Sequence, residues 1–152
     1  MRIGTKIFAA ALGAVVLAGP ALADGKGEID YRKNLMKAVG GHMKALVAIA
    51  KGQTANKGDM KIHADAMIGL SKAAANAFPE GSDSLAAPTE TLDKVWSDPA
   101  GFKKVVMAFQ MESAKVATAA ASGDTKVLAG ALGGLGKNGC KACHDGFREK
   151  KK

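Results

Sequence analysis

The chain has 152 residues, a formal net charge of +8, 47% hydrophobic residues and only 5% aromatic residues. A chain of this length fits a single domain with one core. The basic excess is compatible with docking onto acidic protein faces or anionic membrane surfaces. Because basic and aromatic residues are not interleaved, the charge does not indicate a nucleic-acid-binding protein.

The first 23 residues have the pattern of a secretory signal peptide. A basic start is followed by an uncharged apolar run over 7–18 and by small residues at 21 and 23. The run is too short to cross a bilayer core of about 30 Å as a helix, so a retained membrane anchor is the less favoured alternative. We expect cleavage after residue 23, a mature domain over 24–152 and a location in the bacterial periplasm.

The first helical pattern covers residues 27–51 and ends before Gly52. Its apolar face has steps of three and four residues and consists of Met36, Val39, Met43, Leu46 and Ala50. Arg32 extends this face toward the start of the helix. An arginine in the interior would need an anion as partner, whereas at a helix start its stem can reach back to water.

A second helical pattern follows Asp59, a candidate N-cap, and ends at Phe78-Pro79. Its apolar stripe consists of His63, Met67, Leu70, Ala74 and Ala77. Residues 79–97 are rich in glycine, serine and proline and predict a long connection. Such a length is uncommon inside a domain, so we expect Trp96 to anchor it.

The third helix is predicted to start at Asp98-Pro99, with aspartate as the cap and proline in the first turn. The fourth is expected over 125–150, after a cap at Asp124. Short links within each half make antiparallel neighbours, and the long connection lies between the halves. The sequence therefore predicts an all-α protein, an antiparallel four-helix bundle with a cofactor between facing helices.

The two cysteines of the chain lie near its end, in Cys140-Lys141-Ala142-Cys143-His144. This spacing is the attachment signature of a c-type haem: two thiols bond the porphyrin vinyl groups, and the adjacent imidazole binds iron. A redox dithiol would need a preceding strand, a structural zinc site would need four ligands, and a local disulfide is chemically possible. We predict one covalent haem c held by Cys140, Cys143 and His144.

Glycines 133, 134, 136 and 139 weaken the helix before this motif by up to about 1 kcal/mol each relative to alanine. Close approach of a large flat cofactor would explain them, and so would a kink. A methionine thioether is a common second axial ligand. However, a methionine on an apolar stripe usually fills the core, and periodicity alone does not choose among Met36, Met43 and Met67.

Three segments together resemble the cytochrome c-prime family: Tyr31-Arg32-Lys33-Asn34-Leu35-Met36, Val95-Trp96-Ser97-Asp98 and Cys140-Lys141-Ala142-Cys143-His144-Asp145-Gly146-Phe147-Arg148. The resemblance spans essentially the whole mature chain. It implies a four-helix bundle that is often a homodimer through the first two helices.

The resemblance also implies a role for each site residue. Cys140 and Cys143 would bind the haem, and His144 would be the proximal iron ligand. Arg32 would contact a haem propionate, and Arg148, one helical turn beyond His144, would lie beside the proximal face. Met36 occupies the family's distal position.

Two functions follow from the two possible states of Met36. If its sulfur binds iron, the haem transfers electrons to and from periplasmic redox proteins. If it only covers the iron, as in the high-spin branch of which the Tyr31-Arg32 pair is more typical, the ferrous haem binds nitric oxide or another small gas. We favour electron transfer through a His144/Met36 haem. An enzyme such as a peroxidase is not expected, because His42 faces away from the Met36 stripe and provides no distal base.

Overall fold

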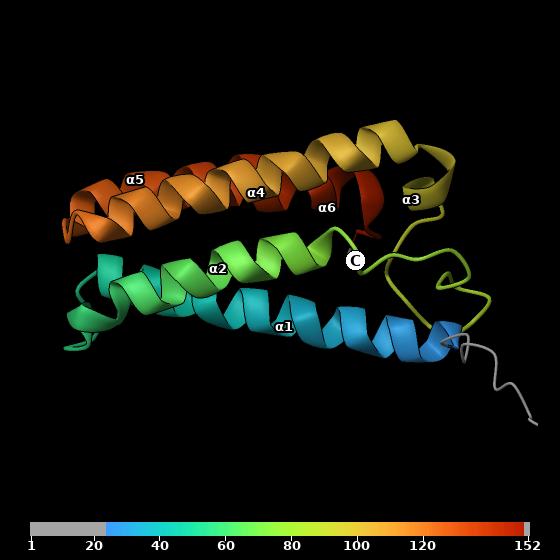
Figure 1. Ribbon diagram of the computed structural model, residues 1–152, viewed down its shortest axis with the longest axis horizontal. Helices are drawn as coiled ribbons and strands as arrows, with labels where there is room; N and C mark the ends of the chain where they lie inside the picture. The colour runs from blue at the N-terminus through green and yellow to red at the C-terminus, as the bar shows by residue number, and fades with distance from the viewer. Residues whose placement is uncertain (1–23, 151–152) are drawn as a thin grey trace, which may run out of the picture.

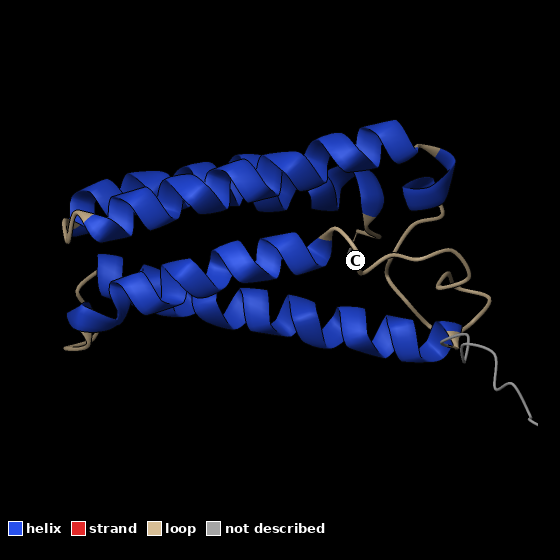
Figure 2. Cartoon of the chain, viewed as in Figure 1, coloured by secondary structure: helices blue, strands red, loops and turns tan. Residues whose placement is uncertain are grey.

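The computed structural model describes residues 24–150, which form helices joined by turns and loops (Figures 1 and 2). The predicted signal peptide lies outside these residues. The helical elements are α1 (Gly25–Ala50), η1 (Lys57–Asp59), α2 (Met60–Ala74), α3 (Lys94–Ser97), α4 (Pro99–Ala121), α5 (Thr125–Gly134), η2 (Leu135–Lys141) and α6 (Ala142–Phe147).

Two antiparallel helix pairs face each other (Figure 1). α1 packs along α2 to form one pair, while α4 packs along α5 and η2 to form the other. Contacts of α2 with α4 and of α1 with α5 close the bundle. The predicted all-α antiparallel four-helix bundle is therefore confirmed, and the long connection lies across one end of it.

Aspartate caps explain where three of the long helices begin. The side chains of Asp24, Asp98 and Asp124 accept hydrogen bonds from backbone N–H groups in the first turns of α1, α4 and α5. Asp59 occupies the cap position of α2 without such a bond, because the 3₁₀ turn of η1 already places it in a helical conformation. The predicted side-chain cap at Asp59 is therefore wrong.

The buried face of α2 also differs from the predicted stripe. Its buried residues are Met60, Ala64, Met67, Ser71 and Ala74, whereas His63 and Leu70 are half-buried at the flanks. Small residues at 64 and 71 face the core. α2 ends at Ala74, and turns continue the chain to the connection.

The sequence predicts one continuous fourth helix to residue 150, and this prediction is wrong. The helix changes from α5 to the π-helical turns of η2, then to α6, and ends at Phe147; Arg148 is extended. A Cβ at Gly139 would lie 2.9 Å from Leu135 Cδ1 and 3.4 Å from Phe109 Cα. Gly139 thus permits the close approach of α4, a reason that the sequence did not reveal.

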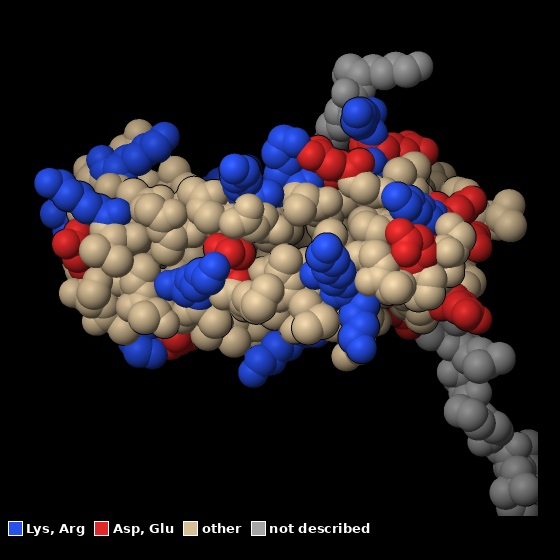
Figure 3. Space-filling model, turned by 90° about the horizontal axis from the view of Figure 1, so that it is seen from above, with Lys and Arg blue, Asp and Glu red and all other residues tan. Residues whose placement is uncertain are grey.

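Charged side chains are distributed unevenly over the molecule. In the view from above, lysine and arginine are spread over the surface, and acidic residues gather toward the end that carries the connection (Figure 3). Within residues 24–150, no helix combines the length and the apolar character that a bilayer crossing requires.

Candidate functional site

The cysteine–histidine motif lies where η2 passes into α6. Cys140 and Cys143 are half-buried free thiols, and Cys140 packs against the hydrophobic core. Burial raises the pKa of both thiols, and the pKa of Cys143 reaches about 11 because Cys140 adds to the effect of burial. Both thiols are therefore protonated at neutral pH.

The raised thiol pKa values and the helical surroundings help to choose among the possible roles of the cysteine pair. A redox dithiol depends on a lowered thiol pKa and follows a strand, whereas here the pKa is raised and the preceding segment is helical. Among residues 24–150, no three histidine, cysteine, aspartate or glutamate side chains lie close enough to hold a metal ion, which removes the zinc alternative. Covalent haem attachment agrees with both observations.

His144 follows Cys143 on α6, and its side chain is exposed. Partial desolvation by neighbouring atoms lowers the pKa of its imidazole, and the charge of Arg148 lowers it further. A lowered pKa favours the neutral ring, which is the form that binds iron. Two free thiols one turn apart beside a neutral imidazole fit haem c: the thiols would hold the porphyrin and His144 the iron.

Arg32 is buried in α1, with only 3% of its surface exposed. Its Nη1 donates to Ala77 O (3.2 Å) and Ser82 Oγ (2.9 Å), while its Nη2 donates to Ser82 O (2.8 Å) and Thr89 Oγ1 (3.2 Å). The alternative in which its stem reaches back to water is therefore wrong. Its hydrogen-bond partners are neutral oxygens of Ala77 and of the connection, and the propionate contact stays a prediction.

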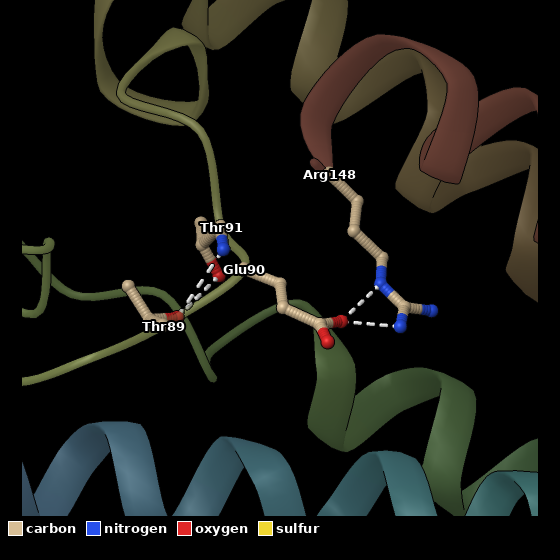
Figure 4. Close-up of polar contacts among 4 residues, drawn as sticks. All are labelled: Thr89, Glu90, Thr91 and Arg148. Carbon is tan, nitrogen blue, oxygen red and sulfur yellow. Dashed lines mark hydrogen bonds and ion pairs between the residues drawn. The ribbon is translucent and has the colours of Figure 1, made fainter. Parts of the chain in front are cut away.

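The same connection holds the end of the haem motif. Nε and Nη2 of Arg148 both donate to Oε2 of Glu90, with 2.7 Å from Nε (Figure 4). Two backbone hydrogen bonds run alongside, from Leu92 N to Phe147 O (3.1 Å) and from Glu149 N to Glu90 O (2.8 Å).

Thr89 and Thr91 complete this link between the two arginines. The Thr89 hydroxyl, which accepts from Arg32, also contacts the Thr91 hydroxyl at 3.2 Å, and Thr91 forms an isolated bridge with Arg148 (Figure 4). Arg148 therefore lies beyond the end of α6. The predicted position on a helical turn after His144 is wrong. Glu90 was missed, because a single glutamate in a polar loop has no periodic signal.

A row of three aromatic rings joins the ends of the helices beside the motif. Phe102 contacts Phe78 (4.8 Å between ring centroids) and Phe147 (5.3 Å), both edge to face. Trp96 Nε1 donates to the backbone oxygens of Phe78 and Pro79, each at 3.2 Å. The predicted anchoring role of Trp96 is confirmed.

Met36 lies one turn beyond Arg32 and is half-buried against the hydrophobic core on which Cys140 also packs. Met43, further along α1, is also half-buried against this core, and Met67 is fully buried. Geometry alone thus places Met36 and Cys140 against one core.

Glu112 of α4 is a second residue that the sequence analysis missed. It is 6% exposed, and its Oε1 accepts from Lys115 Nζ (2.7 Å) and Asn138 Nδ2 (3.5 Å). The Lys115 contact, more than any other, lowers the pKa of this carboxyl. Glu112 thereby ties α4 to η2 just before Cys140. An acidic residue beside Ser113 on the apolar face of α4 was the available signal.

Comparison with known proteins agrees with this geometry. The sequence model of the family described as Cytochrome C' matches residues 27–148. Cytochrome c' of Pararhodospirillum photometricum is 40% identical over 121 residues, covering 80% of this chain and 95% of the relative. Cytochrome c-556 of Agrobacterium tumefaciens (strain II Chrys) is 34% identical over 128 residues, covering 82% and 99%.

Solved structures give the same result. A ferrous variant of cytochrome c prime from Alcaligenes xylosoxidans with bound nitric oxide superposes with a TM-score of 0.76 at 30% identity. The superposition covers 86% of this chain and 99% of that chain.

Proposed function

Because the chain belongs to the cytochrome c' family, we propose that it is a periplasmic haem protein whose ferrous, five-coordinate iron binds nitric oxide or another small diatomic gas. The family binds one covalently attached haem c, and the chain is a c-type haem cytochrome. The observation that carries the gas-binding proposal is the likeness, over 86% of the chain, to a relative solved with bound nitric oxide.

Each site residue then has a defined task. Cys140 and Cys143 would hold the haem by thioether bonds, and His144 would supply the proximal nitrogen. Arg32 would contact a propionate, and Arg148 would lie on the His144 side of the haem. When bound, the haem supplies an iron whose sixth position is available to a small ligand.

The distal residue decides between the two functions. In this proposal Met36 covers the iron position as an apolar side chain and does not bind it. Its place against the hydrophobic core supports that role, since packing, and not a metal bond, can fix the side chain. An apolar distal side would disfavour dioxygen, which gains from a hydrogen-bond donor, and would leave nitric oxide less affected.

A binding role is also favoured over an enzymatic one. His42 and His63 lie with their Nδ1 atoms 2.9 Å apart, so each imidazole faces the other. Neither is then positioned as a distal acid or base. The proposed location rests on the predicted signal peptide and on the bacterial relatives, and a homodimer through α1 and α2 is part of the proposal.

Electron transfer through a His144/Met36 haem, which the sequence analysis favoured, is the second candidate. The observation behind it is that Met36 packs on the same hydrophobic core as Cys140. It would require the Met36 sulfur to bind iron in both oxidation states and a periplasmic redox partner.

The optical spectrum of the purified holoprotein tests the choice. We expect a high-spin ferrous spectrum that changes when carbon monoxide or nitric oxide is added. Met36→Leu should leave the spectrum without added gas nearly unchanged, because leucine also covers the iron position.

Met43→Leu is the matched control, since Met43 packs on the same core from the same helix. A weak ferric band at the red end of the spectrum, present in the unsubstituted protein and in Met43→Leu but absent from Met36→Leu, would establish thioether ligation. That result would replace gas binding by electron transfer.

A further inference from the structure

His42 of α1 and His63 of α2 form a contact that the haem site does not use. Their Nδ1 atoms are 2.9 Å apart, their ring centroids are 5.1 Å apart, and both side chains are half-buried. At this distance the two nitrogens share a hydrogen bond when one ring carries its proton on Nδ1. The same two nitrogens also have the spacing of a metal chelate.

Bond geometry makes the second use possible. Two imidazole nitrogens bound at about 2.0–2.1 Å to one ion lie about 2.9 Å apart when the angle at the metal is roughly 90°. A tetrahedral angle would put them about 3.3–3.4 Å apart. The observed separation of 2.9 Å is close to both values, so a small rotation of the rings brings the two nitrogens to one ion.

We propose that His42 and His63 form a two-histidine site for a divalent transition cation, with Cu²⁺ or Ni²⁺ preferred over Zn²⁺. Tetragonal nitrogen and oxygen coordination is typical of Cu²⁺ and Ni²⁺, and Cu²⁺ is also the tightest-binding ion of the first-row series. Water completes the coordination, since both rings are partly exposed.

A small rotation of the two imidazole rings would let both Nδ1 atoms bind one ion. The rings are inclined at 61°, and the terminal torsion of histidine is soft, so rotation of both rings directs the two lone pairs toward one shared ion. Because the ligands come from neighbouring helices, a bound ion would cross-link α1 to α2. The ion would thereby stabilise the folded protein in proportion to its concentration.

The chain itself provides a clean experiment, because it has three histidines and His144 is occupied by the haem in the holoprotein. Calorimetric titration of the holoprotein with Cu²⁺, Ni²⁺ and Zn²⁺ should give one ion per chain and the lowest Kd for Cu²⁺. Copper electron paramagnetic resonance should show splitting from two nitrogen ligands. Either single substitution, His42→Asn or His63→Asn, should raise the Kd for Cu²⁺ at least about tenfold.

The substitutions by asparagine distinguish loss of the metal site from loss of the hydrogen bond. Its amide occupies the position of Nδ1 and retains a hydrogen bond to the remaining histidine, but it is a poor copper ligand. We expect both variants to keep the metal-free melting temperature and to lose the rise in that temperature caused by Cu²⁺. Unchanged Cu²⁺ affinity in both variants, or no binding to the unsubstituted protein, would overturn the proposal. Neither outcome bears on the gas-binding function, which is measured at the haem.

Discussion

Two arginines attach the connection between α2 and α3 to the rest of the molecule in different ways. Arg32 is buried and donates four hydrogen bonds to neutral oxygens, two of them backbone carbonyls. Arg148 pairs with the carboxylate of Glu90, and the two side chains are 34% and 50% exposed. A buried hydrogen-bond network is expensive to break, whereas an exposed ion pair contributes about 0–1 kcal/mol.

The difference also concerns charge. The carboxylate of Glu90 neutralises the guanidinium of Arg148, while the hydrogen bonds of Arg32 go to uncharged groups. Burial lowers the pKa of Arg32, yet an arginine keeps its proton in proteins. The contact of Arg32 with a haem propionate stays a prediction. The connection is held by buried polar contacts on the α1 side and, on the C-terminal side, by backbone contacts with an exposed pair.

The largest effect is expected at Arg32. In Arg32→Leu, the carbonyls of Ala77 and Ser82 lose their donors while they remain enclosed, which should lower the free energy of unfolding by about 3 kcal/mol. Urea unfolding of the holoprotein, followed by circular dichroism, measures this change.

Arg32→Lys is the control for charge. Lysine keeps the positive charge but lacks the planar fork that reaches several acceptors, so an intermediate loss is expected. If Arg32→Leu unfolds at the same urea concentration as the unsubstituted protein, the buried network does not hold the connection.

We expect the segment that carries the cysteine–histidine motif to be held mainly by its packing against α4. A substitution at Gly139 tests this expectation. Gly139→Ala inserts a methyl group against Leu135 and Phe109 and should cost about 1–3 kcal/mol of unfolding free energy. Gly136→Ala is the matched control, because within residues 24–150 no atom beyond its chain neighbours and its own helix backbone lies within 4 Å of the added methyl group. That variant should be neutral or more stable by up to about 1 kcal/mol, since alanine favours helix. Equal melting temperatures for the two variants would contradict the close approach.

Features of the fold and the site were predictable from the sequence where neighbouring residues determine them. They were not predictable where they depend on contacts between residues far apart in the chain. The caps at Asp98 and Asp124 are local patterns, and the sequence predicted them correctly. The cysteine–histidine motif is also a local pattern, and the haem c that it predicted agrees with the family. The bundle followed from periodicity and link lengths. The Glu90–Arg148 pair and the Gly139–Phe109 contact join residues far apart in the chain, so they depend on how helices and loops meet in space. The π-helical turns of η2 likewise arise from packing and have no local code.

The smallest effect on stability, with the clearest effect on the site, is expected at Glu90. Glu90→Gln removes one exposed ion pair and should change the free energy of unfolding by less than about 1 kcal/mol. It also leaves the charge of Arg148 without the carboxylate of Glu90, four residues along the chain from the predicted iron ligand His144. A positive charge near the haem favours the ferrous state, so the midpoint potential should rise. Redox titration of the holoprotein measures it.

The opposite substitution distinguishes electrostatics from a general disturbance of the fold. Arg148→Gln removes the positive charge and keeps the negative charge of Glu90, so it should lower the midpoint potential. The double variant should return close to the unsubstituted value, because both charges are then absent. A shift in the same direction in both single variants would instead mean that loss of the contact loosens the C-terminal segment. In that case the backbone hydrogen bonds of Leu92 and Glu149 would not be enough to hold Arg148 in place, and the contrast with Arg32 would be weaker than the exposures of the two arginines imply.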